Sequence, residues 1–349
     1  MVYLNCKQMM GETVNNRFQC LDDFEVGQKG VTATRTVTEA DIVNFACVTE
    51  DYSLPHLDRH AMVEGPYGAR VAHGLLGSSL VTGMLSLHAP HIVGRDVPGA
   101  YLYSFDANYR DGIRIGETIR IHWNLTGKSI DSDCRDYGLI TTAFQVVNQD
   151  GVSVYDGSLG TLVPKGTVDS TGLQLQPRQP WQVTPFTPEP DRIYYVEDYP
   201  IGGGGDTGGR TITETDIVNF AGLTGDYNPL SVDAELAGQG VFGARIAHGL
   251  LIFSVIFGRW ISHAPAHPRG APTGGGIVAG HLNDTGIFPA PVKIGDTIRC
   301  RYKTLATRAS ASRPGIGLVT TGLQAVNQKN EVVMEGSTLL MGSSSASGR

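Results

Sequence analysis

The stretch Thr38–Ala46, with the sequence TEADIVNFA, returns 175 residues later as Thr213–Ala221, with the sequence TETDIVNFA. The same interval relates AHGLL at residues 72–76 to AHGLL at residues 247–251. The chain therefore contains an internal duplication, and such repeats decide how every other feature is interpreted.

One ionisable side chain of the first copy, an imidazole, is missing from the second. The interval of 175 residues pairs Asp51 with Asp226, but it pairs His56 with Ser231. Residues that both copies share are expected to serve the fold. A residue that only one copy has is a candidate for function, and His56 is the first such residue.

Length and repeat together predict two domains of about 150 residues each. We expect a first domain over residues 1–163 and a second over residues 193–341. Residues 164–192 contain six prolines and predict an extended linker. The Ser- and Gly-rich residues 342–349 predict a frayed tail.

Composition excludes several classes of protein. The five cysteines are odd in number and show no CxxC pair, which favours a reducing cytoplasm and argues against disulfides or a zinc site. The chain has no apolar run of 18 residues and no basic-then-apolar start, so we expect a soluble, cytoplasmic protein with no membrane partner. A net charge of −7 argues against nucleic acid as a partner.

Each half has the same order of expected elements. A short strand-like stretch (24–27 or 199–202) precedes a helix that opens with the capping-box spacing of Thr and Asp. A second helix (74–88 or 249–263) is apolar on nearly every side, which predicts burial. Strands follow at residues 115–121 and 145–149, or 294–300 and 324–328. Their offset is 179 rather than 175, so the second copy has about four extra residues between its long helix and its sheet. The fold class is α+β, with a strand order that this pattern leaves open.

The loop at residues 49–58 (TEDYSLPHLD) carries the candidate chemistry, with Asp51 and His56 five residues apart. On a loop bent by proline, the two side chains can converge on one water molecule. The imidazole can take a proton from that water, and the carboxylate can orient it. The alternative is that Asp51 caps a turn and His56 lies on the surface.

The AHGLL segment offers a second group. His73 and His248 occur in both copies, which favours a structural role for the imidazole. The amide of Gly74 lies at a predicted helix N-terminus, where free N–H groups attract developing negative charge. This amide could polarise a carbonyl oxygen, as in an oxyanion hole.

The glycine-rich run at residues 202–209 lacks the Gly-Lys-Ser/Thr of a phosphate loop and is expected to be a flexible turn. Arg70 and Arg245 occur in both copies, which favours a structural or general ligand contact. No metal-binding motif is found.

Together these segments resemble the MaoC-like, (R)-specific enoyl-CoA hydratase family, whose signature is Asp-x-Asn-Pro-Leu-His after an aromatic residue and a Gly. The first half has Asp51 and His56 but differs by Glu50, Ser53 and the reversed order Leu54-Pro55. The second half keeps the signature from Phe220 to Leu230 but has Ser231 in place of His.

The resemblance implies a double hotdog, in which each repeat is a curved antiparallel sheet wrapped around a long central helix. It also implies hydration of a 2-enoyl-CoA thioester by a hydro-lyase that needs no metal or redox cofactor. Carried over, Asp51 and His56 activate the water, and the amide of Gly74 holds the thioester oxygen. The implied partners are a CoA thioester and, as an open question, a second copy in a homodimer.

Within this family the tandem layout looks most like the bacterial mesaconyl-CoA hydratases (β-methylmalyl-CoA dehydratases). Tyr52 and Ser53 would then shape the pocket, and Arg70 or Arg110 would receive the second carboxylate. The alternatives are a hydratase of straight-chain enoyl-CoA, a non-catalytic acyl-CoA-binding protein, and a hotdog thioesterase.

Overall fold

The computed structural model describes residues 20–130, 136–166, 173, 175, 178–187, 194–263 and 280–345. The elements of the first half are η1 (Leu21–Asp23), β1 (Lys29–Val31), β2 (Arg35–Thr36), α2 (Glu39–Thr49), α3 (Leu54–Leu57), α4 (Arg59–Met62), α5 (Gly74–His88), η2 (Pro90–Val93), β3 (Tyr101–Tyr109), β4 (Thr118–Ile130), β5 (Tyr137–Val147) and β6 (Ser153–Pro164).

The second half follows after β7 (Thr184–Pro185) and repeats this order, except that its described residues include no counterpart of η2. Its elements are η3 (Val196–Asp198), β8 (Gly203–Asp206), β9 (Arg210–Thr211), α6 (Glu214–Thr224), α7 (Pro229–Val232), α8 (Ala234–Gln239), α9 (Gly249–His263), β10 (Gly280–Ile287), β11 (Thr297–Ala309), β12 (Ile316–Val326) and β13 (Val332–Ser343).

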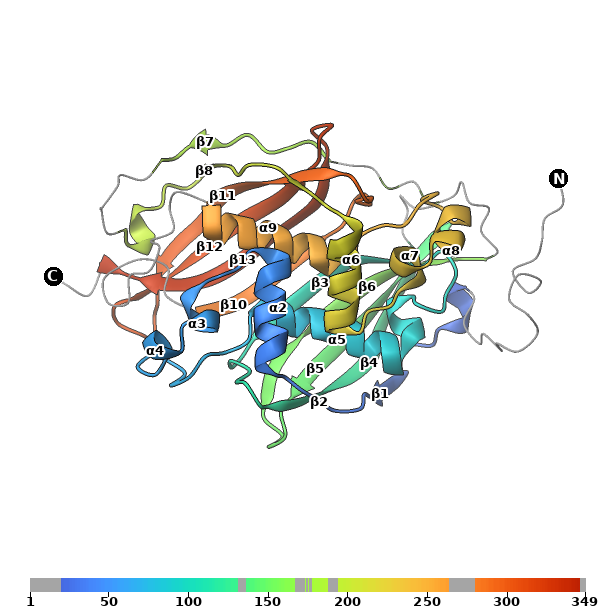
Figure 1. Cartoon of the computed structure of the whole chain (residues 1–349), viewed down its shortest axis with the longest axis horizontal. Helices are drawn as coiled ribbons and strands as arrows, with labels where there is room; N and C mark the ends of the chain where they lie inside the picture. Colours follow the sequence, from blue (N-terminus) through green and yellow to red (C-terminus); the bar gives the residue numbers. More distant parts are fainter. Residues whose placement is uncertain are drawn as a thin grey trace.

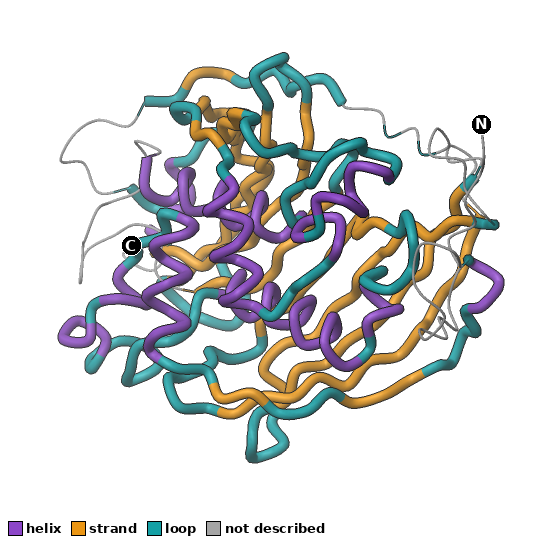
Figure 2. The backbone as a smooth tube through the Cα atoms, turned by 45° about the vertical axis from the view of Figure 1, so that its right-hand side comes forward, coloured by secondary structure: helices purple, strands orange, loops and turns teal. Residues whose placement is uncertain are grey.

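One continuous sheet runs through both halves. The strand order is β1-β4-β5-β6-β3-β10-β13-β12-β11-β8-β7, with β2 on β4 and β9 on β11. The halves meet at the antiparallel pair β3 and β10, where Ala107 lies opposite Asp284. Figures 1 and 2 show the curved sheet behind a layer of helices, with α5 and α9 lying across it. The predicted α+β architecture, a curved antiparallel sheet around a long helix in each half, is confirmed.

The two long helices have the predicted bounds, 74–88 and 249–263. In α5, every residue from Leu75 to Ser86 is buried, as expected of a helix that is apolar nearly all round. Small residues let the helix approach its sheet. A Cβ on Gly77 would lie 1.8 Å from the ring of Tyr155 on β6.

The shorter helices α2 and α6 open with the predicted capping boxes. Thr38 Oγ1 accepts the amide of Asp41, whose carboxylate accepts the amide of Thr38. Thr213 and Asp216 do the same for α6. The two helices lie side by side over the long helices (Figure 1).

Arginines tie each half to the other at the ends of these helices. Arg35 donates to the carbonyls of Leu223 and Thr224, the last two residues of α6. Arg210, its counterpart, donates to the carbonyl of Val48 near the end of α2. A cation at a helix C-terminus satisfies free carbonyls and opposes the helix dipole. Each half therefore holds the other half's loop in place.

Two short segments differ from the sequence predictions. Residues 24–27 and 199–202 are not strands; they lead into turns at Gly27 (φ 98°) and Gly202 (φ 80°), and β1 and β8 follow them. Residues 203–206, half of the glycine-rich run 202–209, form strand β8 rather than a flexible turn. The reason is close packing, because a Cβ on Gly204 would lie 1.9 Å from the carbonyl oxygen of Tyr302 on β11.

The proline-rich segment 164–192 is described only in part. Arg178 bridges to Val332, and β7 pairs in parallel with β8. Trp181 packs on Gly322 with the ammonium of Lys303 4.4 Å from its ring centroid. Residues 178–185 therefore run along the second half's sheet, whereas Pro164 still belongs to β6 of the first half.

The end of the chain is more ordered than predicted up to residue 345. Gly342 and Ser343 belong to β13, and Ser344 donates to the carboxylate of Glu197. Residues 346–349 lie outside the described part.

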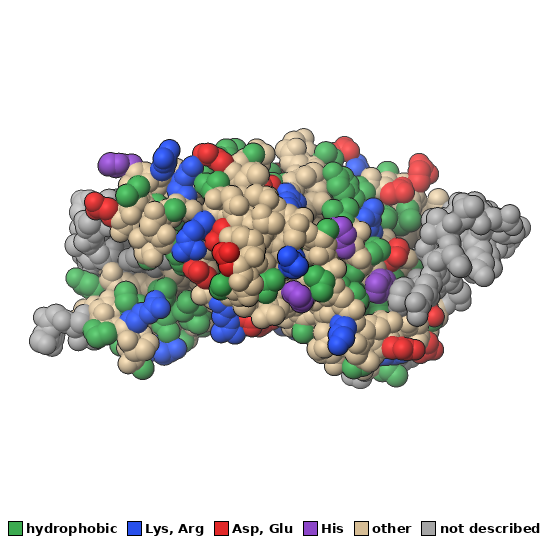
Figure 3. Space-filling view, turned by 90° about the horizontal axis from the view of Figure 1, so that it is seen from below, with side chains coloured by type: hydrophobic (Ala, Val, Ile, Leu, Met, Phe, Trp, Pro, Cys, Tyr) green, Lys and Arg blue, Asp and Glu red, His purple; other side chains and the backbone are tan. Residues whose placement is uncertain are grey.

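Within the described residues, no helix combines the length and the apolar character needed to cross a bilayer. Acidic and basic side chains are interspersed on the face shown in Figure 3.

Candidate active site

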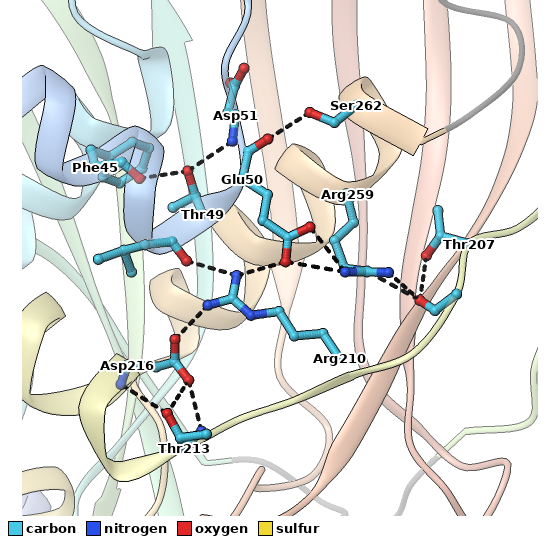
Figure 4. A network of polar contacts seen from close by, with 12 residues as sticks. Phe45, Thr49, Glu50, Asp51, Thr207, Arg210, Thr213, Asp216, Arg259 and Ser262 are labelled. Atoms are coloured by element: carbon cyan, nitrogen blue, oxygen red, sulfur yellow. Dashed lines mark hydrogen bonds and ion pairs between the residues drawn. The ribbon is translucent and has the colours of Figure 1, made fainter.

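The candidate loop begins where α2 ends. Its first residue, Glu50, has a left-handed backbone (φ 67°), a conformation that favours glycine. Gly225 holds the same position after α6 (φ 84°). The Glu50 carboxylate pairs with Arg259 of α9 at 3.0 Å and with Arg210 at 3.2 Å, and Ser262 donates to its carbonyl (Figure 4). Contacts from the second half thus hold Glu50 where the family pattern has Gly.

Asp51 follows and is 3% exposed. Its Oδ1 accepts the amide of Ser53 at 3.1 Å and the hydroxyl of Ser53 at 2.6 Å. Burial raises the pKa of Asp51, but the imidazoles of His73 and His56 and the Ser53 hydrogen bonds outweigh it, so this pKa lies below its usual value. Asp51 is therefore a carboxylate at neutral pH.

His56 lies on α3 with its tautomer set by the backbone. Its Nδ1 is 2.8 Å from the carbonyl oxygen of Val71. A carbonyl only accepts, so Nδ1 carries the proton and Nε2 has the lone pair. Burial lowers the pKa of His56, and the nearby imidazole of His281 lowers it further. These two effects outweigh the carboxylate of Asp51 and the hydrogen bond to Val71, which raise the pKa. His56 is a neutral base at neutral pH.

His73 forms the floor beneath this pair. Its Nε2 lies 3.0 Å from the carbonyl oxygen of Asp51, and its ring centroid lies 3.8 Å from that of His56. Burial lowers the pKa of His73 to about 3. Because His248 makes the same contact with the carbonyl oxygen of Asp226 at 2.8 Å, this role is structural in both halves.

Gly74 is the first residue of α5, and the side chain of the N-cap, His73, makes no capping hydrogen bond. The first amides of a helix have no acceptor within the helix. The amide of Gly74 is thus available to an oxygen atom in the cavity that Gly74 lines.

These groups converge on a cavity of about 140 Å³. One carboxylate oxygen of Asp51 and one ring nitrogen each of His56 and His73 all lie within 4.8 Å of one another. One water making hydrogen bonds of about 2.8 Å to each side can span this distance. Both halves line the cavity: Asp51, Ser53, His56, Gly74, Tyr109, Asp111 and Tyr155 come from the first, and Ser254, Phe257, Ile261, Gly280, His281 and Leu340 from the second.

The same three donors could be considered as metal ligands, since a carboxylate and two imidazoles are a known donor set. The second half argues against metal binding by His73. There His248 makes the same buried contact, although the residue at the position of His56 is Ser231, a poor metal ligand. The arrangement is better suited to holding a water.

The matching loop of the second half lines a smaller cavity, of about 40 Å³. Asp226 and Ser231 are buried there, as are His248 and Leu230. The Oδ1 of Asp226 is buried without a hydrogen-bond partner among the described residues. The scaffold role that the repeat suggested for Asp226 is therefore carried by its backbone, which bonds to Thr224 and His248.

Of the four residues predicted to bind substrate, one lines the cavity and three do not. Ser53 lines the cavity, whereas Tyr52 is 57% exposed and is not among the lining residues. Arg70 pairs with Glu39 at 2.7 Å, and Arg110 pairs with Asp156 at 2.6 Å; neither lines the cavity.

The sequence reasoning missed His281, which lies on β10 and lines the same cavity. A signal was available. At the offset of 179 that relates the strands, His281 aligns with Leu102 and the nearby Asp284 aligns with Phe105. The test that selected His56, an ionisable residue in one copy only, also selects this pair.

Comparison with protein families gives a match to the MaoC like domain over residues 23–142 and again over residues 200–327. A 3-hydroxybutyryl-CoA dehydratase from Methylorubrum extorquens is 32% identical over 100 residues, covering 29% of this chain and 59% of the relative. An (R)-specific enoyl-CoA hydratase from Rhodospirillum rubrum is 37% identical over 106 residues, covering 30% and 66%. Protein MaoC from Klebsiella aerogenes is 35% identical over 129 residues, covering 35% and 36%. The matches thus span less than two thirds of each of these relatives.

Solved structures match nearly the whole chain. A Mycobacterium tuberculosis protein described as a double hotdog superimposes with a TM-score of 0.67 at 13% identity, covering 94% of this chain and 100% of that one. A MaoC-like dehydratase from Phytophthora capsici gives a TM-score of 0.56 at 16% identity, with 93% and 97% covered. The fold is therefore a double hotdog.

Proposed function

The chain belongs to the MaoC-like domain family, and from that premise we propose that it is a hydro-lyase that adds water reversibly to the double bond of a 2-enoyl-CoA thioester. One observation carries the proposal: a buried carboxylate and a neutral imidazole lie within reach of one water, beside the free amide at the start of α5. The names of two relatives, a CoA dehydratase and an enoyl-CoA hydratase, support the reaction class.

Water must be activated before it can add to carbon. In the proposed mechanism Asp51 accepts one hydrogen bond from the water and His56 Nε2 accepts the other. As the oxygen bonds to Cβ, His56 removes a proton, because its lone pair is free at neutral pH. Val71 holds the ring in the required tautomer through Nδ1.

The electron pair of the double bond moves through the conjugated system onto the thioester oxygen, giving an enolate. The amide of Gly74 and the helix dipole of α5 stabilise this charge. Collapse of the enolate returns a proton to Cα from the group that took it. Because one pair of side chains handles both the hydroxyl and the proton, the addition is syn.

For the acyl group we propose a short, polar chain, with mesaconyl-CoA as the substrate and β-methylmalyl-CoA as the product. A cavity of about 140 Å³ with the polar groups of Tyr109 and His281 in its wall suits such a chain better than a long apolar one. Since Arg70 and Arg110 are paired elsewhere, the second carboxylate would bind to other groups of the cavity wall.

The test is to mix the protein with crotonyl-CoA and with mesaconyl-CoA while following the absorbance of the conjugated thioester and the release of free thiol. A hydratase bleaches the absorbance without releasing thiol, and faster for mesaconyl-CoA. Thiol release would identify a thioesterase, and no change in either signal would leave only an acyl-CoA-binding protein.

A further inference from the structure

A second histidine–carboxylate pair enters the cavity from the other half of the chain. His281 Nε2 lies 2.7 Å from Oδ1 of Asp284 and 3.0 Å from Oγ1 of Thr338. The other carboxylate oxygen of Asp284 accepts the hydroxyl of Tyr109 at 2.7 Å, and Ser78 Oγ lies 3.0 Å from that hydroxyl. This chain of polar groups crosses from β10 and β13 to β3 and α5.

The duplicated site shows that the fold does not require this polar chain. The strand registers repeat with an offset of 179, since Asp106 pairs with Ser158 and Thr285 pairs with Ser337. At the matching positions the polar residues His281, Asp284, Thr338, Tyr109 and Ser78 are replaced by Leu102, Phe105, Leu159, Phe288 and Phe253.

Those replacements pack as an apolar cluster. The ring centroids of Phe105 and Phe253 lie 5.1 Å apart, and the rings of Phe105 and Phe288 are stacked at 6.4 Å. The same backbone thus accommodates aromatic packing at one site and buried polar groups at the other. Buried polar groups are costly unless they are satisfied, so their presence only beside Asp51 and His56 indicates a use.

The orientation of His281 indicates what that use is. A Cβ built on Gly74 would lie 2.7 Å from His281 Nδ1. In a helix the Cβ direction tilts toward the N-terminus, so Nδ1 lies beside the N-terminal end of α5, where the free amides are. The ring is fixed there by stacking on Phe257 with centroids 5.0 Å apart and by Tyr109 at 4.5 Å.

We propose that His281, held by Asp284, is a further catalytic residue whose Nδ1–H donates to the thioester oxygen together with the amide of Gly74. With Nε2 bonded to Asp284, donation from Nδ1 requires a proton on each ring nitrogen, and the fully buried carboxyl group of Asp284 lies where it can stabilise that form. The second half, whose own loop lacks a base, thereby completes the site of the first half. This role rests on the proposed hydratase function.

The rate test compares three variants. Replacing His281 with Leu, the residue of the mirror position, removes the donor and should lower kcat by about 10²-fold, the effect of losing one oxyanion donor. Asp284→Asn keeps the shape but removes the counter-charge and one of the two acceptor oxygens, and a smaller loss in kcat is expected. Leu102→Gln places a polar group at the mirror position and should leave kcat unchanged.

A spectroscopic test looks at the oxygen itself. In an Asp51→Asn background, which suppresses turnover, a bound 2,4-dienoyl-CoA should absorb at longer wavelength than in solution, because donors to its carbonyl oxygen draw electron density along the conjugated chain. Adding His281→Leu should reduce this shift, whereas adding Leu102→Gln should not.

The outcomes separate this inference from the proposed function. A wild-type protein that hydrates enoyl-CoA, with His281→Leu or Asp284→Asn folded and equally active, would overturn the role of His281 alone. So would a dienoyl-CoA shift that His281→Leu leaves unchanged. If His281→Leu does not fold, Asp284→Asn decides. A wild-type protein with no hydration activity overturns both, and a loss confined to substrates with a second carboxylate would assign His281 to the acyl group instead.

Discussion

Gly258 of α9 packs directly against the end of α2, and its replacement by alanine tests how the second half holds the catalytic loop. A Cβ here would lie 2.0 Å from the carbonyl oxygen of Thr49 and 2.9 Å from the amide nitrogen of Asp51. Real Cβ contacts are essentially never shorter than 3.0 Å, so the backbone must move by about 1 Å.

Two free energies oppose each other in Gly258→Ala. Alanine raises helix propensity by about 1 kcal/mol over glycine. Overpacking costs about 1–3 kcal/mol, and the upper part of this range, about 2–3 kcal/mol, applies here because the neighbour is backbone, which yields less readily than a side chain. We therefore expect a net loss of about 1–2 kcal/mol in the free energy of unfolding. A shift of about 1 Å in the loop that carries Asp51 should also lower kcat/KM by about 10²-fold.

Gly83→Ala is the matched control. A Cβ on Gly83 of α5 would lie 1.9 Å from the carbonyl oxygen of Thr224, so the steric conflict is the same but it moves the loop of Asp226. Urea unfolding should give similar losses of stability for both variants. Hydration rates, measured where both are folded, should fall only in Gly258→Ala. Equal losses of kcat/KM in the two variants, or none in a destabilised Gly258→Ala, would refute the reasoning.

Three further predictions follow from the site. Because the pKa of His56 is lowered, protonation of His56 should reduce kcat/KM only below pH 6.5; an acid limb centred above 6.5 in the pH–rate profile would contradict this. The pKa of His73 is about 3 in the folded chain and about 6.5 in the unfolded chain, so between these values only the unfolded chain binds a proton at this residue. The free energy of unfolding, measured with urea, should therefore fall as the pH drops from 6.5 toward 3, and it should fall less in His73→Gln. Ser231→His should not restore turnover to His56→Ala, since its cavity is about 40 Å³ and aromatic rings fill the place of the polar chain; recovered activity in the rate assay would count against the one-site account.

The sequence predicted those features that local physics decides. The capping boxes at Thr38 and Thr213 and the two long buried helices appear at the expected residues, because caps and apolar periodicity act over a few residues. The prediction of a flexible turn was wrong for residues 203–206 of the glycine-rich run, which form β8. Its strand depends on a carbonyl of Tyr302, almost 100 residues away, which no local pattern reveals.

The site was predictable to the extent that the repeat exposed it. The difference between His56 and Ser231 pointed to the loop, and the structure brings Asp51, His56 and Gly74 to one cavity. Arg70 and Arg110 were chosen by charge alone, and their pairing with Glu39 and Asp156 depends on tertiary contacts. His281 was missed because the four extra residues change the offset before β10, so the interval of 175 aligns it with the wrong residue.

The most direct test of the account is the ratio of hydration rates of His56→Ala and Ser231→Ala, measured side by side on one enoyl-CoA substrate. We predict that His56→Ala loses at least about 10²-fold in kcat, the usual scale for a lost general base, while Ser231→Ala keeps the wild-type rate. Equal rates in the two variants would contradict the claim that a single water-activating site lies in the first half.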